Sequence, residues 1–217
     1  MESHREMSGR IKNCLWLALM LAGIGFSIWI ERQPDFQKQA PARAEKKTQG
    51  HFATLNDARL VDHRDNDGDS FHIMHDGQEH EFRLYFVDAP EKRLHQFNGR
   101  RIEEQGRYFG GLGTQQTIAI GLEAKALTES LLKGRRFTVK TRWQRVFDSG
   151  RYFAFVFFDE EGGGSEELSE KLVRAGLCRI YTEGASLPDG RREKEFEQHL
   201  KALEHEAKAR QQGAWRF

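Results

Sequence analysis

The segment FRLYFVDAPE, residues 82–91, combines the pattern of a β-strand with a polar turn. Alternation predicts two faces: Phe82, Leu84 and Phe86 on one, and Arg83, Tyr85 and Val87 on the other. An arginine within such a strand is costly unless it meets an anion. Pro90 cannot donate to a strand ladder, so the strand should end at Asp88. A cation and two carboxylates, Asp88 and Glu91, therefore lie where a strand becomes a loop.

The preceding residues predict that this strand belongs to a hairpin. An acidic turn, DNDGD at residues 65–69, leads into an alternating stretch at 70–74. Asp76-Gly77 then gives a strong two-residue hairpin signal. Because paired antiparallel strands run in opposite directions, Asp69 and Asp88 should lie at the same end of the sheet.

The rest of the chain predicts a small β-barrel carrying helices, which is an α+β fold. Further short strands are expected at residues 59–62, 137–141, 152–158 and 177–181. Helices are expected at 122–133, at 166–175 with Ser165 as the cap, and at 193–210. Residues 92–121 read mostly as a loop, with a short helix around 101–108. We therefore expect about five strands and about three main helices.

Composition indicates an ordinary globular protein. The 217 residues are 38% hydrophobic and 31% charged. Residues 1–50 carry 8 basic and 5 acidic side chains. Residues 51–217 carry 26 basic and 28 acidic side chains, so the domain is slightly acidic. This balance disfavours non-specific nucleic-acid binding through bulk charge, so any polyanion site must be local. The two cysteines, Cys14 and Cys178, form no zinc-binding pattern.

The N-terminal region predicts a membrane anchor and a tether. Residues 1–13 form a polar tail, and residues 14–30 are an uncharged apolar run. We expect this run to be an uncleaved signal anchor, with a cleaved signal peptide or a buried helix as the alternatives. Basic residues before it place the tail in the cytoplasm. Residues 31–50 read as a flexible linker, and the domain should occupy residues 51–217.

Five side chains suggest phosphodiester chemistry, although each one has an ordinary structural explanation. Asp69 and Asp88 are candidate ligands for a hard cation such as Ca²⁺. Glu91 could act as a base on water, and Arg83 and Arg151 could bind a phosphate. The alternatives are that the aspartate segment only forms a turn, that Glu91 is a solvated loop carboxylate, and that the arginines form structural ion pairs. An EF-hand is excluded because aligning Gly68 places His63 and Met74 at ligand positions. The histidines have no metal-binding spacing.

Four ordered blocks resemble the staphylococcal nuclease (thermonuclease) family. They are DGDS at 67–70, FRLYFVDAPE at 82–91, DSGR at 148–151 and SEKLVRAGLCRIY at 169–181. The resemblance runs from about residue 60 to residue 215, and its strength comes from the order and spacing of the blocks.

This resemblance implies an OB-fold barrel and a Ca²⁺-dependent nuclease that cleaves DNA and RNA to products with 3′-phosphate ends. The metal ligands would be Asp69, Asp88 and the backbone carbonyl of Ala89. The catalytic residues would be Arg83, Glu91 and Arg151, and Tyr181 would contact the nucleotide. We expect a monomer, anchored to the membrane with its domain in the periplasm or outside the cell, or secreted if the N-terminal segment is cleaved.

Departures from the family pattern leave other functions open. Asp148 and Ser149 replace a lysine and a tyrosine of the family, and the segment from Lys92 to Gly121 is longer than in the staphylococcal enzyme. A catalytically inert OB module that binds nucleic acid is the main alternative. A structural envelope protein is a third hypothesis, which no sequence feature supports. The presence of all five side chains favours the enzyme.

Overall fold

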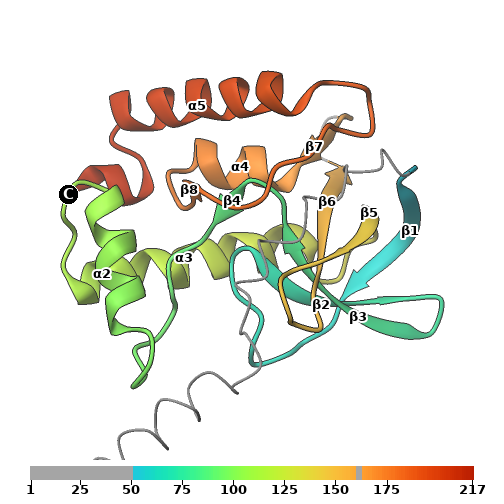
Figure 1. Ribbon diagram of the computed structural model, residues 1–217, viewed down its shortest axis with the longest axis horizontal. Helices are drawn as coiled ribbons and strands as arrows, with labels where there is room; N and C mark the ends of the chain where they lie inside the picture. The colour runs from blue at the N-terminus through green and yellow to red at the C-terminus, as the bar shows by residue number, and fades with distance from the viewer. Residues whose placement is uncertain (1–50, 160–162) are drawn as a thin grey trace, which may run out of the picture. The chain divides into compact units, whose positions relative to one another are not determined.

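Five strands close into a barrel in the computed structural model, which describes residues 51–159 and 163–217 (Figure 1). They are β1 (Ala53–Leu60), β2 (Ser70–His75), β3 (Gln78–Leu84), β5 (Phe137–Arg145) and β6 (Tyr152–Asp159). Antiparallel pairing links β3, β2, β1, β5 and β6 in that order, and a parallel β3–β6 pairing closes the ring. This five-stranded closure is consistent with the predicted OB-fold. A short strand, β7 (Ser165–Glu167), extends the sheet beyond β6.

The β2–β3 hairpin forms as predicted. Asp76 and Gly77 adopt φ values of 47° and 75°, the left-handed backbone that a tight two-residue turn requires. The pairing register places Ser70 directly opposite Arg83. Asp69 therefore precedes β2 at the end of the hairpin where β3 finishes.

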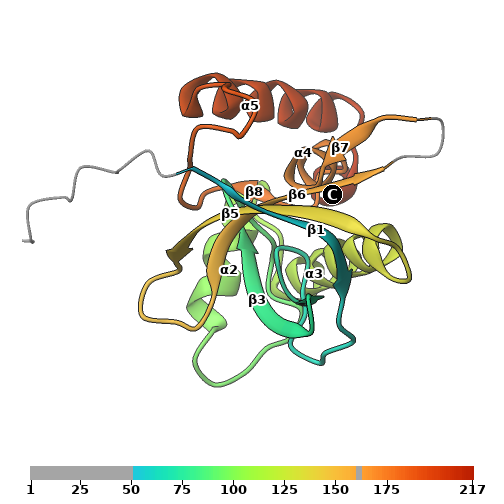
Figure 2. The same ribbon diagram turned by 90° about the vertical axis from the view of Figure 1, so that its right-hand side faces the viewer.

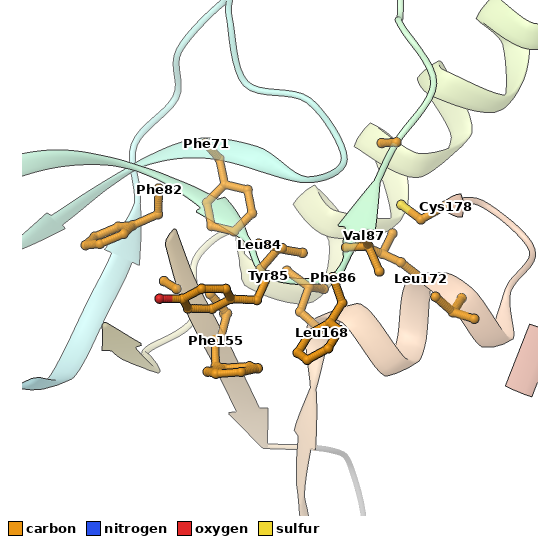
Figure 3. Packing of buried hydrophobic residues seen from close by; sticks show 14 of the residues in the cluster. Phe71, Phe82, Leu84, Tyr85, Phe86, Val87, Phe155, Leu168, Leu172 and Cys178 are labelled. Carbon is orange, nitrogen blue, oxygen red and sulfur yellow. The ribbon is translucent and has the colours of Figure 1, made fainter. Parts of the chain in front are cut away.

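The predicted alternation fails after Leu84. Strand β3 ends there, Phe86 takes a φ of 66°, and the chain then enters β4 (Val87–Asp88). Strand β4 pairs with β8 (Arg179–Ile180) instead of continuing the barrel. Residues of both predicted faces, from Phe82 to Val87, are buried. Figure 3 shows Leu84, Tyr85 and Phe86 packed among the core side chains.

The described residues contain four α-helices, where about three were expected. They are α2 (Gly99–Tyr108), α3 (Thr114–Leu132), α4 (Leu168–Arg174) and α5 (Glu193–Ala209), followed by the 3-10 helix η1 (Gly213–Arg216). Helix α3 starts eight residues before the predicted position. The loop prediction for residues 92–121 was therefore largely wrong. Gly121 had suggested a loop but lies inside α3.

The helices lie on two sides of the sheet. Helix α4 contacts β6 and α5, whereas α3 contacts α2 and β1. Figure 2 shows α4 and α5 on one side of β5 and β6, with α2 and α3 on the other. Helix α4 begins after Glu167 rather than after the predicted cap Ser165, because Ser165 to Glu167 pairs with β6. The Glu167 carboxylate instead accepts hydrogen bonds from the backbone N–H groups of Ser169 and Glu170.

Aromatic side chains fill the space between the barrel and α5. Tyr85 and Phe155 have ring centroids 4.8 Å apart, and Phe86 lies 5.1 Å from Phe196 of α5 in an edge-on arrangement. Edge-on and offset aromatic pairs add stabilisation beyond the area they bury. The turn at Phe86 is therefore held by the core of the domain (Figure 3).

Two glycines allow α3 to approach the DAPE turn at residues 88–91. A Cβ atom on Gly121 would lie 2.4 Å from the carbonyl oxygen of Pro90 and 2.7 Å from that of Glu91. A Cβ atom on Gly68 would lie 2.6 Å from the Cβ of Ala124. The hydroxyl of Thr128 also donates to the carbonyl of Gly68 at 2.8 Å. Helix α3 therefore fixes both the DAPE turn and the turn before Asp69.

The predicted anchor at residues 14–30 and the linker at 31–50 lie outside the described residues. Within residues 51–159 and 163–217, no helix combines the length and apolarity that a membrane span needs.

Glu167 gives a prediction about stability and pH. Burial raises the pKa of this carboxyl to about 7, against the lowering effect of its hydrogen bonds from Ser169 and Glu170. The folded state then holds a proton that the unfolded state releases above about pH 4.5. Stability from this group is therefore present at low pH and is lost as the pH rises towards 7.

Glu167→Gln removes this titration while keeping a hydrogen-bond acceptor at the start of α4. We expect the free energy of unfolding of the variant, relative to wild type, to rise by on the order of 2 kcal/mol between pH 5 and pH 8. Urea denaturation of the full chain at both pH values measures this difference. Glu103→Gln, at an exposed position on α2, is the control. A constant difference across the pH range would contradict the prediction.

Candidate active site

Asp88 is the centre of a buried cluster of charges. Its side chain is buried. Each of its two oxygen atoms accepts two hydrogen bonds. Oδ1 lies 2.5 Å from a guanidinium nitrogen of Arg83 and 2.5 Å from one of Arg101. Oδ2 accepts from Arg179 at 2.7 Å and from the amide of Gln105 at 3.0 Å. One carboxylate thus joins a barrel strand, helix α2 and strand β8.

The surroundings of Asp88 favour its ionised form. Burial alone would raise the pKa of this carboxyl, but the charges of Arg101, Arg83 and Arg179 hold it below its usual value. Burial also acts against the charge of Arg83, and Asp69 and Asp88 overcome that effect and raise the pKa of this guanidinium. These groups therefore remain charged despite their burial.

Asp69 lies beside Asp88, as the hairpin predicted. Its Oδ2 accepts a hydrogen bond from the backbone N–H of Ala89 at 2.8 Å and lies 3.1 Å from the guanidinium of Arg83. Its Oδ1 accepts from the hydroxyl of Ser70 at 3.0 Å. Asp69 and Asp88 thus share Arg83, and Asp69 is bonded to the DAPE turn. Burial and the charge of Asp69 raise the pKa of neighbouring Asp67 well above its usual value.

Arg151 and Arg83 converge on the hydroxyl of Ser70. Arg151 donates to this oxygen at 3.3 Å and Arg83 at 3.4 Å. Arg151 comes from the start of β6, so the parallel β3–β6 pairing brings the two arginines together. Within the part of the chain that the structure describes, Arg151 forms no ion pair with a carboxylate. Two guanidiniums therefore meet at one neutral oxygen.

Glu91 is held at the edge of the same cluster. Its Oε1 lies 2.7 Å from Nε of Arg101, and its Oε2 accepts from the amide of Asn98 at 3.2 Å. Its side chain is 27% exposed, unlike that of Asp88. Glu91 is therefore open to water while remaining linked through Arg101 to Asp88.

Helix α2 supplies two site residues that sequence reasoning missed. Gln105 donates to Asp88 and to the carbonyl oxygen of Ala89, both at 3.0 Å, and accepts from the backbone N–H of Glu91 at 3.0 Å. Arg101 lies one turn earlier on the same face of the helix. Both residues lie within the short helix predicted around residues 101–108, and their four-residue spacing places them on one face, but the sequence did not indicate that this face meets Asp88.

Tyr181 lies against the cluster through Arg179. The guanidinium of Arg179 lies 3.8 Å from the centre of the Tyr181 ring, and the residue is 62% exposed. Arg179 lies within the SEKLVRAGLCRIY block but received no role from the sequence. Strand β8 thus contributes a buried cation to this side of the site, and the residue that follows it contributes an exposed aromatic ring.

The oxygen donors suit a hard cation in type. Asp69, Asp88 and the carbonyl of Ala89 are the carboxylate and backbone oxygens that Ca²⁺ prefers. Yet each of these groups accepts at least one hydrogen bond from the protein. Among residues 51–159 and 163–217, no group of three or more His, Cys, Asp or Glu side chains forms a ready metal site. A cation on Asp88 therefore requires one of its present donors to leave.

The charge cluster predicts that Asp88 is essential for stability. Asp88→Ala would leave three guanidiniums facing one another with their shared carboxylate removed, so we expect a loss of about 3–5 kcal/mol in the free energy of unfolding. Asp62→Ala is the control, since the Asp62–Lys133 pair at 3.2 Å is exposed and should contribute below about 1 kcal/mol. Chemical denaturation measures both. Equal effects of the two substitutions would contradict the buried network.

A comparison with known protein families identifies a match to most of this domain. Residues 81–217 match the family described as staphylococcal nuclease homologue. The matched region includes the DAPE turn, helix α2, Arg151 and strand β8, and Asp69 precedes it. Because the match covers more than half of the sequence, the chain belongs to the staphylococcal nuclease homologue family.

Proposed function

We propose that this protein is a Ca²⁺-dependent nuclease that hydrolyses phosphodiester bonds of DNA and RNA and leaves 3′-phosphate ends. The domain responsible would be residues 51–217. The observation that carries the proposal is the convergence of Arg83 and Arg151 beside Asp69, Asp88 and Glu91. Membership of the nuclease family supports the same chemistry.

Arg83 and Arg151 are suited to stabilise the transition state of phosphodiester hydrolysis. Their guanidiniums meet at the hydroxyl of Ser70, and Arg151 has no carboxylate partner among the described residues. Fixed donors of this kind stabilise negative charge that develops on phosphorus oxygens, because they need no reorganisation during the reaction. Arg83 and Arg151 would therefore hold the scissile phosphate.

Glu91 would position and deprotonate the attacking water. It is the most exposed of the three carboxylates at the site, and Asn98 and Arg101 fix its two oxygen atoms. A carboxylate can take a proton from water that lies within hydrogen-bonding reach. An in-line attack requires this water to lie opposite the leaving oxygen. Glu91 would therefore both orient the water and accept its proton.

Asp69, Asp88 and the carbonyl of Ala89 would hold the Ca²⁺ ion. When bound, a divalent cation supplies charge stabilisation for the phosphate and lowers the pKa of coordinated water. Tyr181 would contact a base or sugar, and its exposure together with the Arg179 guanidinium against its ring supports this role. Exposed aromatic rings stack on bases without strong sequence preference.

A catalytically inert nucleic-acid-binding module is the second candidate. The saturation of Asp88 by three guanidiniums and one amide favours it, because a carboxylate with four donors is not free to bind a metal. This candidate predicts binding of single-stranded DNA without cleavage.

The cellular setting is also proposed. We infer that residues 14–30 anchor the chain as an uncleaved helix, and that a monomeric nuclease domain lies in the periplasm or outside the cell. The uncharged run and the basic tail before it support this arrangement.

Cleavage of single-stranded DNA and RNA by the purified full chain tests the nuclease directly. We expect cleavage with Ca²⁺, arrest by a chelator, and 3′-phosphate ends detectable by mass spectrometry. Glu91→Gln and Arg151→Ala should each lower the rate by about 10²–10³, because each removes a group that acts in the transition state. Arg100→Ala, at an exposed position on α2, should retain full activity. A folded protein that binds DNA and never cleaves it would support the inert module instead.

The mass of the native N-terminus tests the anchor. An intact N-terminus in protein recovered from membranes is expected for an uncleaved anchor. A mature chain that begins beyond residue 30 would show that the apolar run is a removed signal peptide.

A further inference from the structure

The three guanidiniums on Asp88 differ in how firmly they are held. The side chains of Arg83 and Arg179 are 10% and 5% exposed, whereas that of Arg101 is 41% exposed. Arg83 and Arg179 project from strands β3 and β8. Arg101 reaches the carboxylate from helix α2, and its side chain as a whole is partly exposed. A path to solvent therefore exists for Arg101 alone among these three.

The remaining contacts of each arginine reinforce this difference. Arg83 also contacts Asp69 and Ser70, and Arg179 stacks on Tyr181. Arg101 contacts the Glu91 carboxylate through Nε at 2.7 Å, but this nitrogen makes no well-directed hydrogen bond within residues 51–159 and 163–217. Arg101 is thus held by one hydrogen bond to Asp88 and by its charge, whereas its Nε has no hydrogen-bond partner among the described residues.

Arg101 lies between two carboxylates of the candidate active site. Its guanidinium bridges Asp88 and Glu91, with contacts of 2.5 Å and 2.7 Å. Within the cluster, Asp69, Asp88 and Glu91 face Arg83, Arg101 and Arg179, and Arg151 lies beside Arg83 at the hydroxyl of Ser70. Withdrawal of Arg101 would remove the guanidinium that contacts both Asp88 and Glu91, and would free one acceptor position on Oδ1 of Asp88. That position would then be available to a cation.

We propose that Arg101 is an internal cation that competes with a divalent metal ion for Asp88, so that metal binding requires Arg101 to withdraw towards solvent. This inference rests on the proposed function, since it assumes that Asp88 can bind a metal. Helix α2 would thereby set the metal concentration at which the site becomes active. The long segment at 92–121 would have a regulatory role in addition to its structural one.

Calorimetric titration of the full chain with Ca²⁺ alone tests the competition. We expect Arg101→Gln to bind Ca²⁺ about tenfold or more tightly than wild type, because it removes a charge in direct contact with the ligand. Arg101→Lys keeps the charge and should stay within about threefold of wild type. Arg100→Gln is the matched control on the exposed face of α2, where Arg100 pairs with Glu104, and should equal wild type. Thermal unfolding of each variant checks that the fold is retained.

The outcomes separate this inference from the proposed function. Tighter binding by Arg101→Gln, with the lysine and control variants near wild type, supports the competition. Ca²⁺ binding that is equal or weaker in Arg101→Gln overturns the competition and leaves Ca²⁺-dependent hydrolysis standing. Failure of every variant to bind Ca²⁺ overturns the competition together with the calcium part of the proposed function, and the cleavage assay then decides whether hydrolysis occurs without calcium.

Discussion

One buried carboxylate, Asp88, joins segments that are far apart in the sequence. Residues 83, 101 and 179 meet on its two oxygen atoms, and Gln105 provides a fourth donor. A buried ion costs several kcal/mol in lost hydration unless such partners replace the water. The cluster therefore forms only when strand β3, helix α2 and strand β8 are all in place. The same geometry that satisfies Asp88 also places Arg83 beside Arg151.

Close backbone packing provides the rigidity that this charge network needs. The left-handed turn at Phe86 redirects the chain from the barrel to β4, and α3 lies against the DAPE turn where Gly121 leaves no room for a side chain. Functional groups must be held within fractions of an ångström, and a scaffold of strands and a packed helix achieves this better than a free loop. The site is thus a product of tertiary packing around a short polar turn.

The sequence predicted the parts of this arrangement that depend on local signals. Asp76-Gly77 specified the β2–β3 hairpin, so the proximity of Asp69 to the DAPE turn followed from strand register. The sequence did not predict the break after Leu84, because a positive φ at Phe86 is imposed by its buried neighbours and not by its residue type.

The sequence also failed to predict the roles of Arg101, Gln105 and Arg179. Their importance arises from long-range contacts with Asp88, which no local pattern encodes. Glycines around residues 110–113 favoured a loop there, so the first turns of α3 were not predicted, whereas the short helix around 101–108 was. The candidate catalytic set was therefore found from local motifs, while its supporting cations required the folded chain.

The most direct test of the account is a crystal structure of the full chain with Ca²⁺ and a short DNA that contains a nonhydrolysable linkage. The account predicts a phosphate within hydrogen-bonding distance of both Arg83 and Arg151, and a Ca²⁺ ion on Asp69 and Asp88. A DNA strand bound elsewhere on the barrel, with its phosphates distant from both guanidiniums, would contradict it.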